Sequence, residues 1–129
     1  MDSIFTKIIK KEIPAYIIDE NDYFISILDI NPIKLGHTLI IPKVQIDYFF
    51  DIDNDLLSKT MPYCKKISTA IKKAIECERI GLSIIGLEVP HAHIHLIPIN
   101  SINDMNFNNA KPISKDEMIE IQNKIKSFL

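Results

Sequence analysis

The chain has 129 residues, a formal net charge of −2 and a hydrophobic fraction of 47%. Basic and acidic residues are interspersed, so the charge pattern favours neither a nucleic-acid partner nor an anionic membrane surface. The length suits one domain spanning residues 1–129, which can bury about two thirds of its unfolded surface. No apolar run approaches the length of a membrane span and no secretory signal is evident, so we expect a cytoplasmic protein.

The first predicted element is a short amphipathic helix over residues 3–11. Apolar and basic side chains alternate there at helical spacing, with Ile4, Phe5 and Ile8 on the apolar side. The segment opens with a serine, a preferred N-cap, and it should end before Pro14 because the residue preceding a proline disfavours helical backbone. The pattern by itself predicts only a helix that covers a sheet.

Two β-branched and aromatic stretches, residues 16–20 and 23–28, predict strands that an Asn-Asp turn signal joins into a hairpin. Residues 38–42 predict the next strand. Asp29 and His37 lie between these strands, in a stretch whose Asn-Pro pair and glycine favour turns. Taken alone, both are consistent with ordinary loop residues.

A long amphipathic helix should follow, from the acidic N-cap candidates of residues 51–55 towards Cys77. Its apolar stripe should pack on the sheet while its lysines face water. Pro62 removes one backbone hydrogen bond, so we expect a kink or a helix boundary there. Cys64 and Cys77 fall within this predicted helix, too far apart along it to bridge, which predicts free thiols in a reducing compartment.

Residues 79–86 and 91–100 predict two antiparallel strands joined by a short connection, residues 87–90. The asparagine-rich stretch 99–109 predicts a loop that lies over the site or against a dimer partner. A capping-box pattern then begins a last helix at about residues 115–128. No internal repeat, linker or second domain is evident.

Three of the four histidines, His91, His93 and His95, occupy alternate positions in the last predicted strand. Successive side chains of a strand point to opposite faces, so the three imidazoles should share one face. Ala92 and Ile94 would point to the other face, which should pack in the core. The strand would therefore present a row of imidazoles to a cleft.

The residues alone leave three interpretations of this row. Burying three imidazoles in one register for packing is costly. A metal site has support because imidazole is the commonest zinc ligand, yet the outer Cα atoms would lie roughly 13 Å apart at the usual strand rise. Two neighbouring histidines could chelate an ion, whereas three would be strained. In the third interpretation, a neutral imidazole attacks phosphorus or an acyl carbon while its neighbours orient it.

The motif His-x-His-x-His followed by two apolar residues, here residues 91–97, resembles that of the histidine triad (HIT) family of nucleotide hydrolases and transferases, in its Hint-like branch. Residues 4–14 and 29–43 are also similar to segments of that family. The resemblance implies an α+β fold with an antiparallel sheet of about five strands, one long helix, shorter terminal helices and a homodimer. The core would span about residues 3–107.

The resemblance also implies a role for each matched residue. His93 would attack the α-phosphorus and form a nucleotidyl-histidine intermediate that water cleaves, while His95 would hydrogen-bond the phosphate oxygens. His91 and His37 would support the nucleophile, and Asp29 would bind the ribose hydroxyls. The remaining substrate contacts would come from residues around the nucleotide: Ile4, Phe5, Ile8, Ile30, Gly86 and Glu88.

The sequence departs from the family pattern in two places. Many relatives carry zinc-binding cysteines at the positions of Ser3 and Thr6, so we expect no structural zinc here. Leu87 and Glu88 replace an amide and a hydroxyl that contact the α-phosphate or leaving group in relatives. A carboxylate there would repel a phosphate oxyanion. Glu88 is therefore either a proton donor, a group that recognises an amine leaving group, or an exposed loop acid.

The resulting prediction is an enzyme that releases a nucleoside monophosphate from a phosphoramidate, phosphoester or phosphoanhydride. AMP is expected because a purine is the family's usual base. No metal or other cofactor is required, since imidazoles and backbone N–H groups can stabilise the charge. The alternatives are a metal-dependent hydrolase that uses two of the triad histidines, and a nucleotide-sensing module with weak catalysis.

Overall fold

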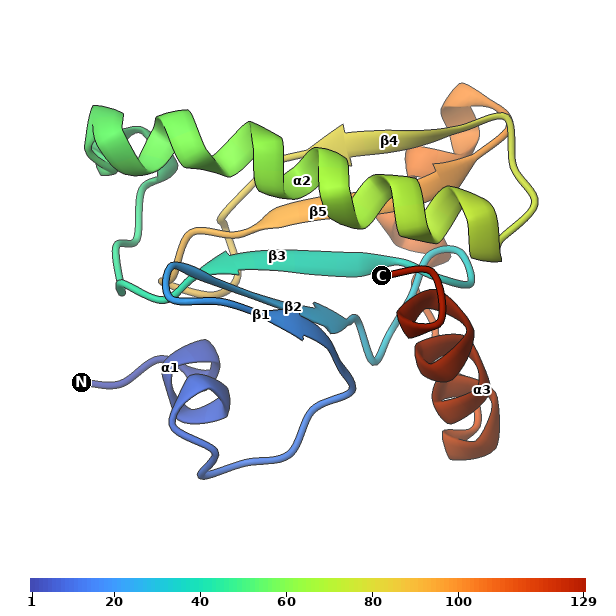
Figure 1. The fold of residues 1–129 in the computed structure, drawn as a ribbon, viewed down its shortest axis with the longest axis horizontal. Helices are drawn as coiled ribbons and strands as arrows, with labels where there is room; N and C mark the ends of the chain where they lie inside the picture. The colour runs from blue at the N-terminus through green and yellow to red at the C-terminus, as the bar shows by residue number, and fades with distance from the viewer.

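The computed structural model describes residues 1–129 and contains a five-stranded antiparallel sheet with three α-helices (Figure 1). The strands lie in the order β1-β2-β3-β5-β4. This architecture confirms the α+β prediction. The elements are α1 (Ile4–Ile9), β1 (Ile17–Glu20), β2 (Phe24–Leu28), β3 (Thr38–Pro42), α2 (Asn54–Ala74), β4 (Arg79–Ser83), β5 (Ile94–Ile99) and α3 (Lys115–Lys126).

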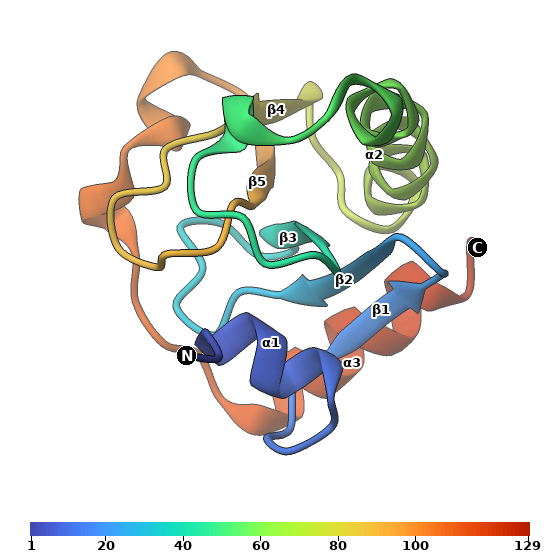
Figure 2. The same cartoon turned by 90° about the vertical axis from the view of Figure 1, so that its left-hand side faces the viewer.

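The central strands are buried on both faces. In β2, Ile25 and Ile27 pack with Phe5 of α1, whereas Phe24 and Leu28 belong to the larger core beneath α2 and α3. Figure 2 shows α2 on one side of the sheet and α1 on the other. Because each face has its own cover, β2 and β3 are buried along their whole length.

The long helix begins where the acidic cluster predicted it. The Asp53 carboxylate accepts the N–H of Leu56 at 2.8 Å and caps α2. The helix runs through Pro62 without ending, so of the two outcomes expected there, a kink or a boundary, the boundary does not occur. Thr60 and Tyr63, on either side of the proline, are buried against the sheet, and this packing outweighs one lost backbone hydrogen bond.

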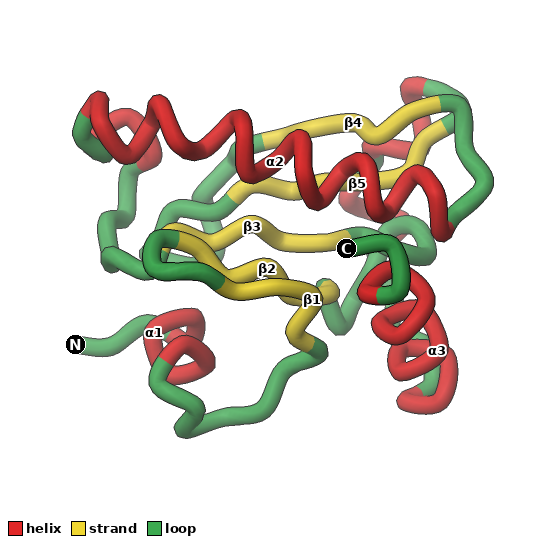
Figure 3. The backbone as a smooth tube through the Cα atoms, viewed as in Figure 1, coloured by secondary structure: helices red, strands yellow, loops and turns green.

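The two strands around the histidines are shorter than predicted. β4 ends at Ser83 and β5 begins at Ile94, so residues 84–93 form a loop (green in Figure 3) rather than the ends of two strands. This loop leaves the ladder because the N–H of Ala92 donates to the Ile46 carbonyl at 2.7 Å, outside the sheet. His91 and His93 therefore precede the strand on which they were predicted.

The alternation nevertheless persists through this loop. Ala92, Ile94 and Leu96 all pack in the core beneath α2. On the other side, the His93 and His95 rings are in contact, with centroids 5.0 Å apart.

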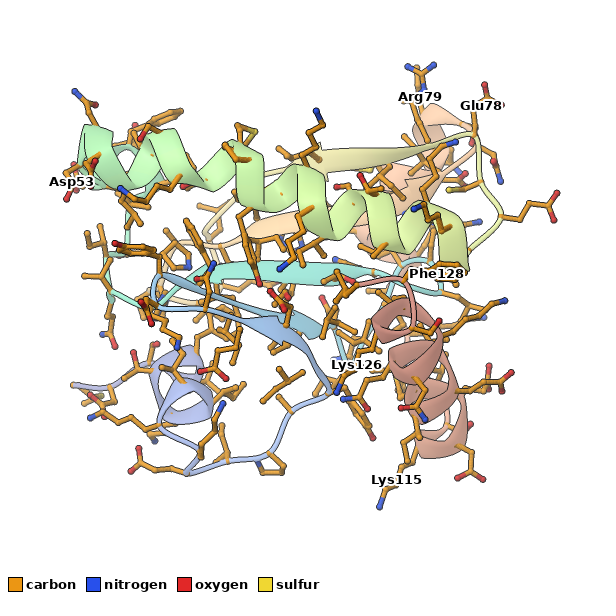
Figure 4. All side chains as sticks on the ribbon, viewed as in Figure 1. Asp53, Glu78, Arg79, Lys115, Lys126 and Phe128 are labelled. Atoms are coloured by element: carbon orange, nitrogen blue, oxygen red, sulfur yellow. The ribbon has the colours of Figure 1, made fainter.

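The outer surface carries the charged residues. In Figure 4 the labelled side chains of Glu78, Arg79 and Lys115 project away from the sheet. Cys77 lies beyond the end of α2, not within it, and both cysteines are free thiols. None of the helices combines the length and apolar character needed to span a lipid bilayer.

Candidate active site

A cavity of about 430 Å³ lies between α1, the end of β2, the 84–93 loop and the start of β5. Thirteen of its nineteen lining residues are hydrophobic, which suits a ligand with a flat apolar part and a few polar groups. Nine of the eleven predicted site residues line it: Ile4, Phe5, Ile8, Asp29, Ile30, Gly86, Glu88, His93 and His95. The other two, His91 and His37, lie buried behind the wall.

The apolar end of the cavity is formed by α1 and the segment after β2. Phe5 and Ile8 are buried, whereas Ile4 and Ile30 remain 52% and 62% exposed. The Phe5 ring also packs edge-to-face against His93, with centroids 4.9 Å apart. A short helix thus brings the apolar wall into direct contact with the polar end of the cavity.

His93 presents a lone pair to the cavity. Its Nδ1–H donates to the His91 carbonyl at 2.8 Å, so in the neutral ring Nε2 is unprotonated. Nε2 makes no hydrogen bond within the protein, and no buried side-chain nitrogen or oxygen lacks a partner. The small exposed part of this ring, 6% of the residue, therefore includes the Nε2 edge.

His95 presents a proton beside that lone pair. The Ile33 N–H donates to Nδ1 of His37 at 3.2 Å, which leaves the His37 proton on Nε2. This Nε2–H donates to Nδ1 of His95 at 2.9 Å. The neutral His95 ring therefore carries its proton on Nε2, the nitrogen without a protein partner. A backbone amide thus determines, through two rings, that His95 is a hydrogen-bond donor.

Burial keeps these imidazoles neutral. It lowers the pKa of His37 to about 3 and that of His95 to about 4, since desolvation disfavours the charged ring. The pKa of His91 is also lowered, mainly by burial and against a hydrogen bond to the Pro42 carbonyl. At neutral pH the neutral tautomers deduced above for His37 and His95 are consequently the species present.

Asp29 lies at the polar end of the cavity. One carboxylate oxygen accepts the Asn31 N–H at 2.9 Å, and the other lies 3.6 Å from Nε2 of His37. Because the His37 ring is neutral, this contact is not an ion pair. Burial raises the pKa of the Asp29 carboxyl, and the nearby Glu88 carboxylate acts in the same direction. Both acids line the cavity.

His91 cannot contact a ligand through its ring. Its Nε2–H donates to the Pro42 carbonyl at 2.7 Å, and Nδ1 accepts the hydroxyl proton of Ser3 at 2.7 Å. The ring is fully buried. Its contribution to the site is the carbonyl oxygen that orients His93.

Two clusters of side chains carry potential metal ligands. Ligand atoms of Asp29, His37 and His95 lie within 4.8 Å of one another. The Ile33 N–H, however, occupies Nδ1 of His37 and leaves a proton on Nε2, where a metal needs a lone pair. Binding an ion there requires that hydrogen bond to break.

The zinc position expected from the family does not fit this chain. Ser3, Thr6 and Gln45 offer neutral hydroxyl and amide oxygens, and His91 has both ring nitrogens in hydrogen bonds. Zinc in structural sites prefers thiolates and imidazoles, so this donor set does not suit it.

Phe107 was not predicted as a site residue. It begins the 3-10 turn Phe107–Asn109 and lines the cavity, with its ring edge-on to His95 at 4.9 Å between centroids. The predicted loop over the site therefore does cover it. An aromatic residue within an asparagine-rich stretch is the sequence signal that could have identified it.

A larger groove of about 850 Å³ lies elsewhere, between residues 32–35, the end of α2 and the start of α3. It contains no histidine and does not include Asp29. The chemistry therefore concentrates in the smaller cavity.

Comparison with known proteins agrees with this geometry. Residues 10–102 match the family model of the HIT domain. An uncharacterized HIT-like protein of Borreliella burgdorferi is 40% identical over 104 residues, which cover 75% of this chain and 75% of that protein. The adenosine 5'-monophosphoramidase HNT1 of Saccharomyces cerevisiae is 41% identical over 96 residues, covering 74% of this chain and 61% of the yeast protein.

A solved structure extends the similarity to the whole fold. The crystal structure of a Hit-like protein from Bartonella henselae superposes with a TM-score of 0.87 at 31% identity, and the match covers 99% of this chain and 96% of that one. The histidine motif, the strand order and the cavity lie within the matched region. The chain belongs to the HIT family.

Proposed function

We propose that the protein cleaves a nucleoside monophosphate, AMP in the first instance, from a conjugate in which the phosphate carries a leaving group. Two ring nitrogens that line the cavity support this most directly. Nε2 of His93 offers a lone pair to the cavity, and Nε2 of His95 carries a proton that it can donate to a ligand. The yeast relative is an adenosine 5'-monophosphoramidase, which supports a phosphoramidate as the first substrate to test.

The base, ribose and α-phosphate of a nucleotide would each contact a different part of the cavity. The apolar wall formed by Ile4, Phe5 and Ile8 would hold the base, with Ile30 at its exposed edge. Asp29 would accept hydrogen bonds from the two ribose hydroxyls, which a carboxylate can do simultaneously. In this binding mode the α-phosphate would lie at the polar end of the cavity.

The chemistry follows from the two ring edges that face that end. His93 Nε2 attacks the α-phosphorus, a P–N bond to the ring forms, and the bond from phosphorus to the leaving group breaks. His95 donates its Nε2–H to a phosphate oxygen and stabilises the developing charge. Water then cleaves the nucleotidyl-histidine, which regenerates the lone pair and releases the monophosphate. Two steps replace one difficult displacement.

Substitution of His93 by alanine tests this proposal. The variant should lose AMP release from adenosine 5'-phosphoramidate by about 10³-fold or more, because no other ring presents a lone pair to the phosphate. AMP binding, followed by thermal shift, should persist because the base and ribose contacts remain. Release at the wild-type rate by His93→Ala would contradict the mechanism.

The same pair of measurements separates the alternatives. Wild-type protein that binds AMP but releases none would instead be a nucleotide-sensing module, the interpretation favoured by the Leu87-Glu88 departure. A metal-dependent hydrolase would lose activity on chelator treatment and contain a stoichiometric ion by elemental analysis. We expect no loss of activity with a chelator and no stoichiometric ion, since the His37 tautomer disfavours a metal at the cluster of Asp29, His37 and His95.

Glu88 would face the leaving group. It lines the cavity with His93 and lies near enough to Asp29 to raise that carboxyl's pKa. A carboxylate there repels an anionic leaving group and attracts a cationic one, so Glu88 favours amine leaving groups that carry a positive charge. Alternatively, a protonated Glu88 would supply the proton that a departing amine needs.

Matched substrates test the role of Glu88. The two substrates are adenosine phosphoramidates whose leaving amines have the same short chain. The chain ends in an ammonium in one substrate and in a carboxylate in the other. Glu88→Gln should reduce the preference for the ammonium form in kcat/KM by about five- to tenfold, as expected for losing one charge interaction of ~1 kcal/mol. Glu78→Gln removes a surface carboxylate that does not line the cavity and serves as the control. An unchanged preference in Glu88→Gln would refute this role.

We also propose that residues 1–129 act as one unit and pair as a homodimer. β4 is an edge strand, and Leu82, Ile85 and Leu87 on and after it are 43%, 47% and 89% exposed. An exposed apolar edge strand favours pairing with another chain, and a second copy of this strand could extend the sheet.

A further inference from the structure

A cluster of four polar side chains connects α1 to His91, two residues before the nucleophile. Ser3 Oγ lies 2.7 Å from Nδ1 of His91, and Thr6 Oγ1 lies 3.4 Å from the same nitrogen. Gln45 Oε1 accepts the Ser3 N–H at 2.8 Å and the Thr6 hydroxyl at 2.6 Å. The Gln45 amide then donates to the Met1 carbonyl at 2.8 Å. Three segments distant in sequence meet in this cluster.

The directions of these hydrogen bonds are determined. His91 Nε2–H donates to the Pro42 carbonyl, so Nδ1 of the neutral ring must accept. The Thr6 hydroxyl proton goes to Gln45, which leaves the Ser3 hydroxyl as the donor to His91 at the shorter distance. Ser3 is only 6% exposed and His91 is fully buried, so water cannot replace this donor easily.

The cluster acts on His93 through a single atom. The His91 carbonyl accepts the Nδ1–H of His93 at 2.8 Å, and that bond leaves the lone pair on Nε2. A His91 ring held at both nitrogens holds its own backbone in place. Ser3 also caps α1 by accepting the Thr6 N–H at 3.0 Å, and α1 carries Phe5, whose ring packs on His93.

We propose that Ser3 and Gln45 are positioning residues that orient the nucleophile through His91, a role that rests on the proposed function for its catalytic readout. Where the family resemblance implies a zinc ion, this chain uses hydrogen bonds among neutral groups to link α1 to the active site. The link therefore needs no metal, and its strength depends on the Ser3 hydroxyl.

Substitution of Ser3 by glycine separates this role from helix capping. Glycine is nearly as good an N-cap as serine, so α1 should keep most of its stability while the donor to His91 is lost. We expect kcat for AMP release to fall about tenfold with KM changed less than twofold. Ser3→Thr keeps the hydroxyl and should recover at least half of the wild-type kcat. Ser114→Gly removes the equivalent cap of α3, far from the cavity, and should leave kcat unchanged.

A second variant and a second readout keep the proposal testable if Ser3→Gly folds poorly. Gln45→Met removes an exposed side chain and should lower kcat about threefold. Nitrogen-15 NMR of the histidine rings needs no turnover. Wild-type His91 should be a single Nε2–H tautomer and His93 a single Nδ1–H tautomer. In Ser3→Gly the Pro42 carbonyl still holds His91 as Nε2–H, whereas His93 should become a mixture of tautomers because the His91 backbone is less well held. A single Nδ1–H tautomer of His93 in folded Ser3→Gly, or equal loss of kcat in the glycine and threonine variants, would overturn the positioning role. Absence of AMP release from the wild type would refute the proposed function alone.

Discussion

The chemistry of the site depends on which ring nitrogens carry protons. A series of hydrogen bonds runs from the Ile33 N–H through His37 to His95, and each ring in it accepts on one nitrogen and donates on the other. Protonation of either ring would place two N–H groups against each other. Burial prevents this at neutral pH by lowering the pKa of His37 to about 3 and that of His95 to about 4.

These pKa values predict how stability depends on pH. Both lie below the ordinary value of 6.5, so the unfolded chain binds protons first as pH falls. The free energy of unfolding should be at its full value above pH ~6.5 and decline towards pH ~4. Each histidine contributes up to about 1.4 kcal/mol per pH unit to the slope of this decline. Urea denaturation between pH 7 and 4.5 measures the slope, and His37→Asn should reduce it. Equal slopes for the variant and the wild type would contradict the assignment.

The elements were predictable where local pattern and tertiary context agree. The strand Thr38–Pro42 has the predicted bounds, and the Ser3 and Asp53 caps lie where the N-cap preference placed them. A helix boundary does not form at Pro62 because buried neighbours on α2 hold the helix together across it. The start of β5 was misjudged because Ala92 bonds to a loop carbonyl, and no local sequence pattern indicates that partner.

The site was predictable as a set of residues but not as a set of hydrogen bonds. The motif around His93 and its resemblance to a family identified the residues that line the cavity. The bond between His37 and His95 joins residues 58 positions apart, and the one between Ser3 and His91 spans 88. Such pairs follow from the strand order and from how α1 lies on the sheet. Phe107 was missed for the same reason, since only the folded chain places its turn over His95.

At the scale of the whole molecule, the exposed edge of β4 predicts self-association. One chain has a mass of 14.8 kDa, so size-exclusion chromatography with light scattering should give the wild-type protein about twice that mass. Leu82→Lys places a charge on the edge strand and should give the monomer mass. Ile119→Lys, on an exposed position of α3, is the matched control and should remain dimeric. A monomeric wild type at micromolar concentration would exclude the dimer.

The covalent intermediate is the most direct test of the central claim. Single-turnover reaction with adenosine 5'-phosphoramidate, quenched in alkaline denaturant to protect the P–N bond, should give protein that carries one adenylyl group. Peptide mapping should place that group on His93, and a longer reaction time should show it decaying as AMP appears. Release of AMP with no adduct at any time, or an adduct on another residue, would contradict attack by the Nε2 lone pair of His93.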